Sequence, residues 1–254
     1  MPRASFKLIR DKDLKEQKDR LWNLNDSQSD LVSMATHQIK TPLAGIKWTL
    51  RMLLGGELGS LNDEQKKWLE DSYDSNERVL SLIDEMLESI RVDENKLEIT
   101  KKEENLLEVI KETIEQLQLF IKKKKISIHV STVPHSQSVM ANVDRGKIQI
   151  ALQNVIENAI RYTRDGGHID IQVVKETGDI KVSIKDDGIG IPEADKKDIF
   201  SRFFRASNAI HKIEKGSGLG LFISRGIIEK HGGKIWFESN QDQGTTFYFI
   251  IPKT

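Results

Sequence analysis

The chain has 254 residues, of which 37% are hydrophobic and 31% charged, so it is long enough for two domains with a buried core. Lysine plus arginine and aspartate plus glutamate both total 39, and this balance gives no net field that would favour nucleic acid or an anionic membrane. The absence of cysteine excludes disulfides and thiolate metal sites, and no apolar run reaches the roughly 20 residues of a membrane-spanning helix. We therefore expect a cytoplasmic protein with no membrane segment in this chain, although a longer protein that contains it could be membrane-anchored.

Residues 1–30 predict a helical linker. Phe6 to Asp11 alternate like the end of a strand, and a charged segment of helical composition follows. Along this segment, mostly apolar residues recur every three or four positions in a seam, which favours a parallel coiled coil between two copies of the chain. Gln17 and Gln28 interrupt this seam; they either weaken a short helix or keep a signalling linker ready to change register. The seam consists of residues spaced by three and four: Leu14, Gln17, Leu21, Leu24, Gln28, Leu31 and Ala35.

The next segment, residues 31–54, predicts a helix that exposes a histidine. His37 lies two positions from both Ala35 and Ile39, and two positions are roughly 200° around a helix, so the ring points away from the apolar stripe. Such a histidine is either an ordinary surface residue or a reactive imidazole. Pro42 predicts a kink just after it. The stripe consists of Ala35, Ile39, Leu43, Ile46, Leu50 and Leu53.

A second helix follows the glycine-rich break at residues 55–59. Asn62, with Gln65 three positions later, predicts an N-cap with a capping box. Two long helices with facing stripes form an antiparallel hairpin, and pairing with a second copy would complete a dimeric four-helix bundle. The apolar repeat of the second helix ends near residues 92–96. We therefore divide the chain into a linker (1–30), a hairpin (31–94) and a further domain (95–254). The second stripe consists of Leu69, Tyr73, Asn76, Leu80, Ile83, Leu87 and Ile90.

Residues 95–254 predict an α/β sandwich with one helical layer, because helices and antiparallel strands alternate along them. We expect helices over residues 105–123, 144–162 and 222–231, and strands over residues 126–130, 168–174, 180–185, 234–238 and 246–251.

Two segments of this domain have side chains suited to phosphates and a base. Asn154, Asn158 and Arg161 share one face of a predicted helix, and such a face suits phosphates and Mg²⁺, which prefers oxygen ligands. Asp186 ends a predicted strand just before a glycine turn, where a carboxylate can accept a hydrogen bond from an exocyclic amine. Each segment alone is equally compatible with a solvated face or a plain turn.

A third segment, residues 216–221, has the sequence Gly-Ser-Gly-Leu-Gly-Leu and opens a predicted helix. Free N–H groups at a helix start favour an anion, and the helix dipole adds to this preference. This segment therefore suits a bound anion.

The motifs resemble those of a known family. His37 to Leu43 resembles the phosphoacceptor box of sensor histidine kinases, and only Gln38, where the family has an acidic residue, departs from it. The Asn-rich helix, Asp-x-Gly-x-Gly, Phe203-Phe204, Gly-x-Gly-x-Gly-Leu and residues 244–247 resemble, in this order, the ATP-binding Bergerat fold shared with gyrase, Hsp90 and MutL. The resemblance spans nearly the whole chain and implies the core of a bacterial-type two-component kinase.

This resemblance implies ATP and Mg²⁺ as cofactors. Asp186 would bind the adenine amine, Asn158 would coordinate Mg²⁺ with Asn154 close by, Arg161 would contact phosphate, and Tyr162 would lie near the adenine. Residues 205–216 would form a mobile lid. The remaining nucleotide-site residues that it implies are Gly188, Gly190, Arg202, Arg205, Gly216, Gly218, Leu219, Gly220 and Thr245.

The implied chemistry is transfer of the γ-phosphoryl group to His37 and then to an aspartate in the receiver domain of a response regulator. Gln38 can accept a hydrogen bond from the ring but cannot take its proton, so it supports orientation without general-base help. Thr41 would position a water for dephosphorylation of the regulator, and Trp48 is either a core-flanking residue or an anchor for it. The expected partners are a second copy through the hairpin, the regulator and an upstream PAS-like sensor. The alternative is a pseudokinase-like, ATP-gated dimeric scaffold without phosphotransfer.

Overall fold

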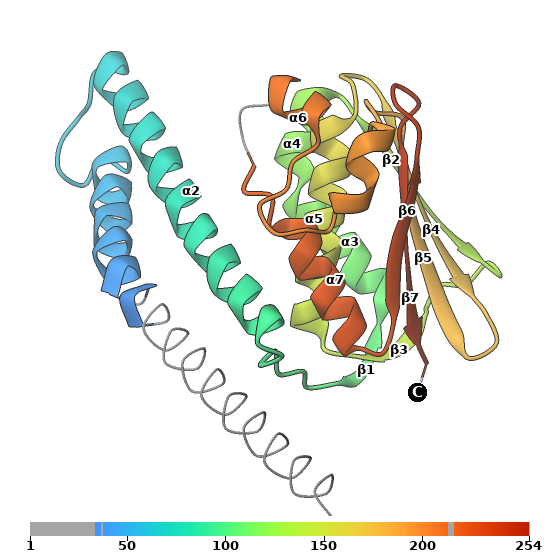
Figure 1. Cartoon of the computed structure of the whole chain (residues 1–254). Helices are drawn as coiled ribbons and strands as arrows, with labels where there is room; N and C mark the ends of the chain where they lie inside the picture. The colour runs from blue at the N-terminus through green and yellow to red at the C-terminus, as the bar shows by residue number, and fades with distance from the viewer. Residues whose placement is uncertain (1–33, 37, 213–215, 254) are drawn as a thin grey trace, which may run out of the picture. The chain divides into compact units, whose positions relative to one another are not determined.

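The computed structural model describes residues 34–36, 38–212 and 216–253. The chain divides into two compact units, Met1–Ile90 and Arg91–Thr254 (Figure 1). The predicted coiled coil of residues 1–30 and the predicted phosphoacceptor His37 lie outside the described residues, and the domain boundary placed at residue 94 stays a prediction. Within the described residues, no helix is both long and apolar enough to cross a membrane.

The first unit contains the predicted helical hairpin. Residues 38–54 are helical through Pro42, and α2 spans Asp63–Asp93. Asn62 and Gln65 form the expected capping box, in which each backbone N–H donates to the other's side-chain oxygen, at 3.0 and 2.8 Å. The predictions that the first helix ends at residues 55–59 and that a second helix begins after Asn62 are therefore confirmed.

Ion pairs between the two helices show that they run antiparallel. Lys40 Nζ lies 2.5 Å from Asp84 Oδ1, and Lys47 Nζ lies 2.8 Å from Glu77 Oε1. As the residue number rises on the first helix, it falls on the second. Both pairs are solvent-accessible, so they define the register of the hairpin more than they stabilise it.

The apolar stripe of the first helix is only partly covered within one chain. Leu43, Leu50 and Leu53 are half-buried, whereas Ile39 and Ile46 are 51% and 50% exposed. Apolar side chains repeated along one helix face and left in water favour association with another apolar surface.

The second unit has helices on one face of a five-stranded sheet with the strand order β2-β4-β5-β7-β6 (Figure 1). The buried core is continuous between the sheet and the helices α3, α5 and α7. The strands are β2 (Ser127–Val133), β4 (His168–Lys175), β5 (Asp179–Asp186), β6 (Lys234–Ser239) and β7 (Thr245–Pro252), and the helices are α3 (Leu106–Gln116), α4 (Gln118–Lys124), α5 (Arg145–Tyr162), η1 (Glu193–Asp198), α6 (Ser207–Lys212) and α7 (Gly220–Lys230).

The sheet is mixed, so the expectation of antiparallel strands throughout is wrong for β2. Ser127 lies opposite His168 in a parallel pairing of β2 with β4, and the other three strand pairs are antiparallel. The reason is the connection: α5 lies between β2 and β4 in the sequence, and such a crossover returns the chain in the same direction.

Two further features differ from the expected elements. The helix predicted over residues 105–123 is broken at Leu117 (φ −95°, ψ 3°), which lets both Leu117 and Ile121 enter the core. Two short strands, β1 (Lys102–Asn105) and β3 (Met140–Val143), form a separate antiparallel ribbon. Four residues are too few for a period-2 pattern to stand out in the sequence.

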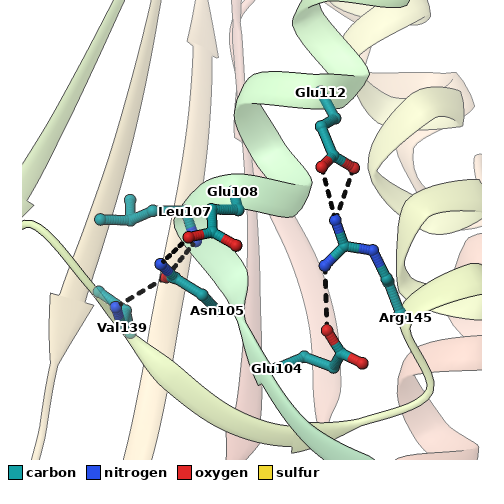
Figure 2. A network of polar contacts seen from close by, with 7 residues as sticks. All are labelled: Glu104, Asn105, Leu107, Glu108, Glu112, Val139 and Arg145. Atoms are coloured by element: carbon teal, nitrogen blue, oxygen red, sulfur yellow. Dashed lines mark hydrogen bonds and ion pairs between the residues drawn. The ribbon is translucent and has the colours of Figure 1, made fainter.

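Polar side chains join this ribbon to the helices, as Figure 2 shows. Arg145, at the start of α5, donates to Glu104 of β1 at 3.0 Å and to Glu112 of α3 at 2.6 Å. Asn105 accepts from the backbone N–H of Val139 at 3.1 Å and caps α3. These contacts fix the N-terminal end of α5, the helix that also bears the predicted phosphate-binding face.

The same end of α5 is bonded to α7 through a buried histidine. The backbone N–H of Asp144 donates to His231 Nε2 at 3.0 Å, so the ring's proton is on Nδ1, which lies 2.8 Å from the carbonyl oxygen of Ile227. Burial lowers the pKa of His231, which favours this neutral form. The two helices that frame the candidate site are thus held together at the end remote from it.

Candidate active site

One wall of the site is a polar face of α5. Asn154, Asn158 and Arg161 are half-buried and follow each other at spacings of four and three, as predicted. Asn154 Nδ2 donates to the carbonyl oxygen of Gly220, the first residue of α7, at 3.1 Å. The amide face of α5 is therefore directed towards the N-terminal end of α7.

The glycine-rich segment packs closely against this face. A Cβ at Gly216 would lie 2.9 Å from Arg161 Nη1 and 3.8 Å from Arg205 Nε, and a Cβ at Gly220 would lie 3.2 Å from Asn154 Oδ1. Two guanidinium groups from different elements thus meet beside Gly216. Such a pair of cations next to a helix N-terminus suits a polyphosphate.

Gly218 and Leu219 hold the segment in place. Gly218 has φ 74°, and a Cβ there would lie 2.6 Å from the carbonyl carbon of Phe203, so no other residue fits without a shift. Leu219 is 2% exposed and lies in the core, which gives its side chain a packing role.

Asp186 lies at the end of β5 and is 5% exposed. Its Oδ1 accepts from the backbone N–H of Gly188 at 2.9 Å and from that of Thr245 at 3.2 Å. Because both bonds fall on Oδ1, Oδ2 is the oxygen that a ligand amine could reach. Thr245 therefore lies beside Asp186 and contacts it through its backbone, a contact that the sequence did not predict.

The loop after Asp186 is joined to the end of α5. The backbone N–H of Ile189 donates to the carbonyl oxygen of Tyr162 at 3.3 Å, and a Cβ at Gly188 would lie 2.5 Å from that same oxygen. Gly190 has φ 61° and packs against the backbone of Asn240. The predicted base-binding and phosphate-binding segments are thus adjacent.

Burial raises the pKa of Asp186 to about 6, and the negative charge of Asp187 adds to this shift. The N–H bonds from Gly188 and Thr245 oppose it, since they stabilise the ionised form. A bound amine would stabilise the carboxylate further, so binding of the predicted nucleotide would be coupled to loss of this proton.

We predict that nucleotide binding weakens in acid because of Asp186. With a pKa of about 6, the dissociation constant should rise about tenfold between pH 7 and pH 5, in excess of any change that comes from the phosphates. Asp186→Asn places an NH₂ group against the ligand amine and should weaken binding about 10²-fold. The measurement is the dissociation constant of a fluorescent ATP analogue for both proteins across this pH range. Parallel pH profiles of the two proteins would exclude Asp186 as the group that titrates.

Arg202 lies at a different place from Arg205. Its Nη1 donates to Asp93 Oδ2 at 2.8 Å, and its guanidinium lies 5.2 Å from the centre of the Phe222 ring. A contact of Arg202 with the γ-phosphate stays a prediction. Within the predicted lid, α6 is described, and residues 213–215 lie outside the described residues.

Ser239 belongs to the site but was not predicted from the sequence. Its buried hydroxyl lies 2.8 Å from Thr245 Oγ1, donates to the carbonyl oxygen of Gly244 at 2.9 Å and accepts from the backbone N–H of Ile191 at 2.9 Å. It thus joins the β6–β7 turn to the loop after Asp186. A serine at the end of a strand has no local signal that would reveal this role.

The residues described around the predicted phosphoacceptor lie on the first helix of the hairpin. Gln38 and Thr41 are exposed and three positions apart, hence on one side of that helix. His37 itself lies outside the described residues.

The side chains of this site suit a Mg²⁺ ion that is bound mainly by the phosphates of the nucleotide. Among the described residues, no three histidine, aspartate or glutamate side chains cluster into a metal site. Mg²⁺ commonly takes one or two protein oxygens and fills its octahedron with phosphates and water. The amide oxygen of Asn158 is suited to such a position.

Two family descriptions match the chain: the His Kinase A (phospho-acceptor) domain at residues 27–95 and the histidine kinase-, DNA gyrase B- and HSP90-like ATPase at residues 143–254. Sensor histidine kinase WalK of Bacillus subtilis is 28% identical over 90% of this chain and 37% of its own length. The catalytic domain of histidine kinase ThkA is 38% identical, with a TM-score of 0.54, over 62% of this chain and 97% of that one. Histidine kinase ThkA in complex with response regulator protein TrrA is 27% identical, with a TM-score of 0.60, over 98% of this chain and 67% of that one.

The fold and the site define an ATP-binding domain joined to a helical hairpin. The chain belongs to the histidine kinases, with a phosphoacceptor domain followed by the ATPase domain of the family, so the family and the fold class inferred from its motifs are confirmed. It spans 37%, 25% and 63% of the length of the first three curated relatives that it matches.

Proposed function

We propose that this chain is the kinase core of a sensor histidine kinase, which transfers the γ-phosphoryl group of ATP to His37 and then to an aspartate of a response regulator. The observation that carries the proposal is the convergence of Arg161 and Arg205 at Gly216, in the same unit as the buried carboxyl of Asp186. The ATPase family match supports ATP as the ligand, and the match of residues 27–95 to a phosphoacceptor domain supports histidine as the acceptor. The complex of ThkA with a response regulator supports the second transfer.

The residues of the second unit would bind the nucleotide from both ends. Asp186 Oδ2 accepts from the adenine amine, and Tyr162 lies beside the base. Arg161 and Arg205 neutralise the phosphates, and the N–H groups from Gly218 to Gly220 support them at the start of α7.

Asn158 would hold Mg²⁺, with Asn154 close to the metal and fixed by its bond to Gly220. When bound, Mg²⁺ neutralises charge that develops on the phosphate oxygens during transfer. Asn158 would supply a neutral amide oxygen, and the neighbouring carboxylate of Glu157 is paired with Arg161 at 3.9 Å.

The transfer itself needs an unprotonated nitrogen on His37. The bond between the γ-phosphorus and the bridging oxygen breaks, its electron pair leaves with ADP, and a nitrogen–phosphorus bond forms. The other ring nitrogen becomes acidic, and its proton passes to water. Gln38 would accept a hydrogen bond from that N–H. Thr41 would position the water that hydrolyses the aspartyl phosphate of the regulator to aspartate and inorganic phosphate.

A second copy of the chain would cover the exposed apolar stripe and complete a four-helix bundle. Ile39 and Ile46 on the first helix, and Leu82 and Met86 on the second, are 43% to 51% exposed in one chain. The coiled coil proposed for residues 1–30 and a PAS-like sensor before it would transmit a signal to this dimer.

Incubation with γ-³²P-ATP and Mg²⁺ tests the proposal. We expect label that is lost in acid and retained in alkali, because a phosphoramidate hydrolyses in acid. A pseudokinase-like scaffold, the alternative that Gln38 suggests, would bind ATP and incorporate no label. Acid-stable label would instead indicate a serine, threonine or tyrosine acceptor.

Gln38→Glu should raise the rate of autophosphorylation modestly. A carboxylate at this position stabilises the cationic ring formed on attack, whereas the neutral imidazole that attacks is already well populated near pH 7. We expect an increase of a few fold, below the roughly 10²-fold scale of a general base. Single-turnover rates from pH 6 to 8 measure it, and a slower variant across that range would show that the site is built around an amide.

A further inference from the structure

The C-terminal end of α5 has an unusual set of partners for its carbonyl groups. A helix leaves its last carbonyls without intrahelical donors, and each buried one needs another partner. Lys124 Nζ, from the end of α4, donates to the carbonyl oxygens of Ile160 at 2.9 Å, Arg161 at 2.9 Å and Thr163 at 2.6 Å. The carbonyl oxygen of Tyr162, between them, accepts from Ile189.

One ammonium group therefore holds the turn that bears two residues of the site. Arg161 and Tyr162 belong to this turn, and Ile189 belongs to the loop after Asp186. The positive charge also lies at the negative end of the α5 dipole, where it is favourable. The backbone supports the same junction, because the carbonyl oxygen of Lys124 accepts from the N–H of Gly166 at 2.8 Å.

Lysine suits this position better than other donors. Its ammonium group directs three N–H bonds from a single atom, which matches three carbonyls that converge on one point. Arginine has its donors spread over a planar fork, and glutamine has two donors on a shorter stem. Lys124 is half-buried, and burial lowers its pKa, against the opposing charge of Asp165.

We propose that Lys124 is a positioning residue for the nucleotide site: it fixes the last turn of α5 so that Arg161 and Tyr162 meet the loop of Asp186 in the geometry that ATP requires. This inference rests on the proposed function and extends it to a residue remote from the ligand. Lys124 acts through the backbone of α5 and does not touch the nucleotide.

Lys124→Met tests the inference, because methionine keeps an unbranched stem of similar length and removes all three donors. Lys123→Met is the matched control, since Lys123 is the exposed neighbour on the same helix. The measurement is the dissociation constant of the full chain for a fluorescent ATP analogue with Mg²⁺, with circular dichroism and melting without nucleotide to establish that each variant is folded. We expect Lys124→Met to bind about tenfold to 10²-fold more weakly, Lys124→Arg to lie between, and Lys123→Met to match the wild type.

The pH profile separates positioning by the ammonium group from mere packing of the stem. Because burial lowers the pKa of Lys124, the wild type should lose one N–H donor at a lower pH than an ordinary lysine would as the pH is raised. The ratio of the wild-type affinity to that of Lys124→Met should then fall. The ratio of the Lys124→Arg affinity to that of Lys124→Met should stay constant, because arginine stays charged.

Two results would overturn the inference. One is a folded Lys124→Met variant that binds within twofold of the wild type. If that variant does not fold, the other is a folded Lys124→Arg variant, with its donors spread over a planar fork, that binds within twofold of the wild type. Failure of the proposed function is distinct from both, since the wild type itself would then show no saturable binding and Asp186→Asn would change nothing.

Discussion

Replacing His37 by glutamine abolishes labelling from γ-³²P-ATP, by at least about 10³-fold, while nucleotide affinity stays within about twofold of the wild type. The physical reason is that the proposed acceptor and the proposed nucleotide pocket lie in different units. In the proposed mechanism the nucleophile comes from the phosphoacceptor domain and the nucleotide contacts come from the second unit, so the glutamine amide should remove the attacking nitrogen without changing the pocket. Labelling and nucleotide affinity are measured on the same preparation.

His129→Gln is the matched control for this variant. His129 is exposed on β2 of the second unit, so its loss should leave both measurements unchanged. Acid-labile label that persists in His37→Gln, or that disappears in His129→Gln, would place the acceptor elsewhere.

Asn158→Ala should impair labelling through the nucleotide site and leave the phosphoacceptor intact. We expect Mg²⁺-dependent labelling to fall about 10²-fold or more, because the proposed protein ligand of the metal is removed. The dimer should persist, since its apolar surface lies on the hairpin. Initial labelling rates against Mg²⁺ concentration, with sedimentation as the check on the dimer, measure both effects.

Gln153→Ala provides the control on the same helix. Gln153 is also a half-buried amide, but its Nε2 donates to Glu157 at 2.9 Å. Its loss should leave the Mg²⁺ dependence of the wild type intact. Normal labelling by Asn158→Ala at limiting Mg²⁺ would show that α5 does not hold the metal.

Local signals were enough to predict much of the fold. The capping box at Asn62 and Gln65, the N-cap Asp144 and the alternation in β4 and β5 each depend on residues close together in the sequence, and the structure confirms them. The amide face of α5 was predictable for the same reason, because its residues recur at helical spacing.

The features that were missed depend on contacts between distant segments. The parallel pairing of β2 with β4 follows from a crossover, and the role of Lys124 follows from its reach to carbonyls 36 to 39 positions away. In the sequence, Lys124 is one of four consecutive lysines, and no local pattern distinguishes it from its neighbours. Arg202 was predicted beside the phosphates by the resemblance alone, and only the structure reveals its bond to Asp93.

The proposed function requires that His37 itself carries the phosphoryl group. Its most direct test is mass spectrometry at neutral pH of peptides from the protein incubated with ATP and Mg²⁺, with fragmentation gentle enough to keep a nitrogen–phosphorus bond. We expect one phosphoryl group on the imidazole of His37. Phosphorylation of another residue, or none with ATP bound and Mg²⁺ saturating, would contradict it.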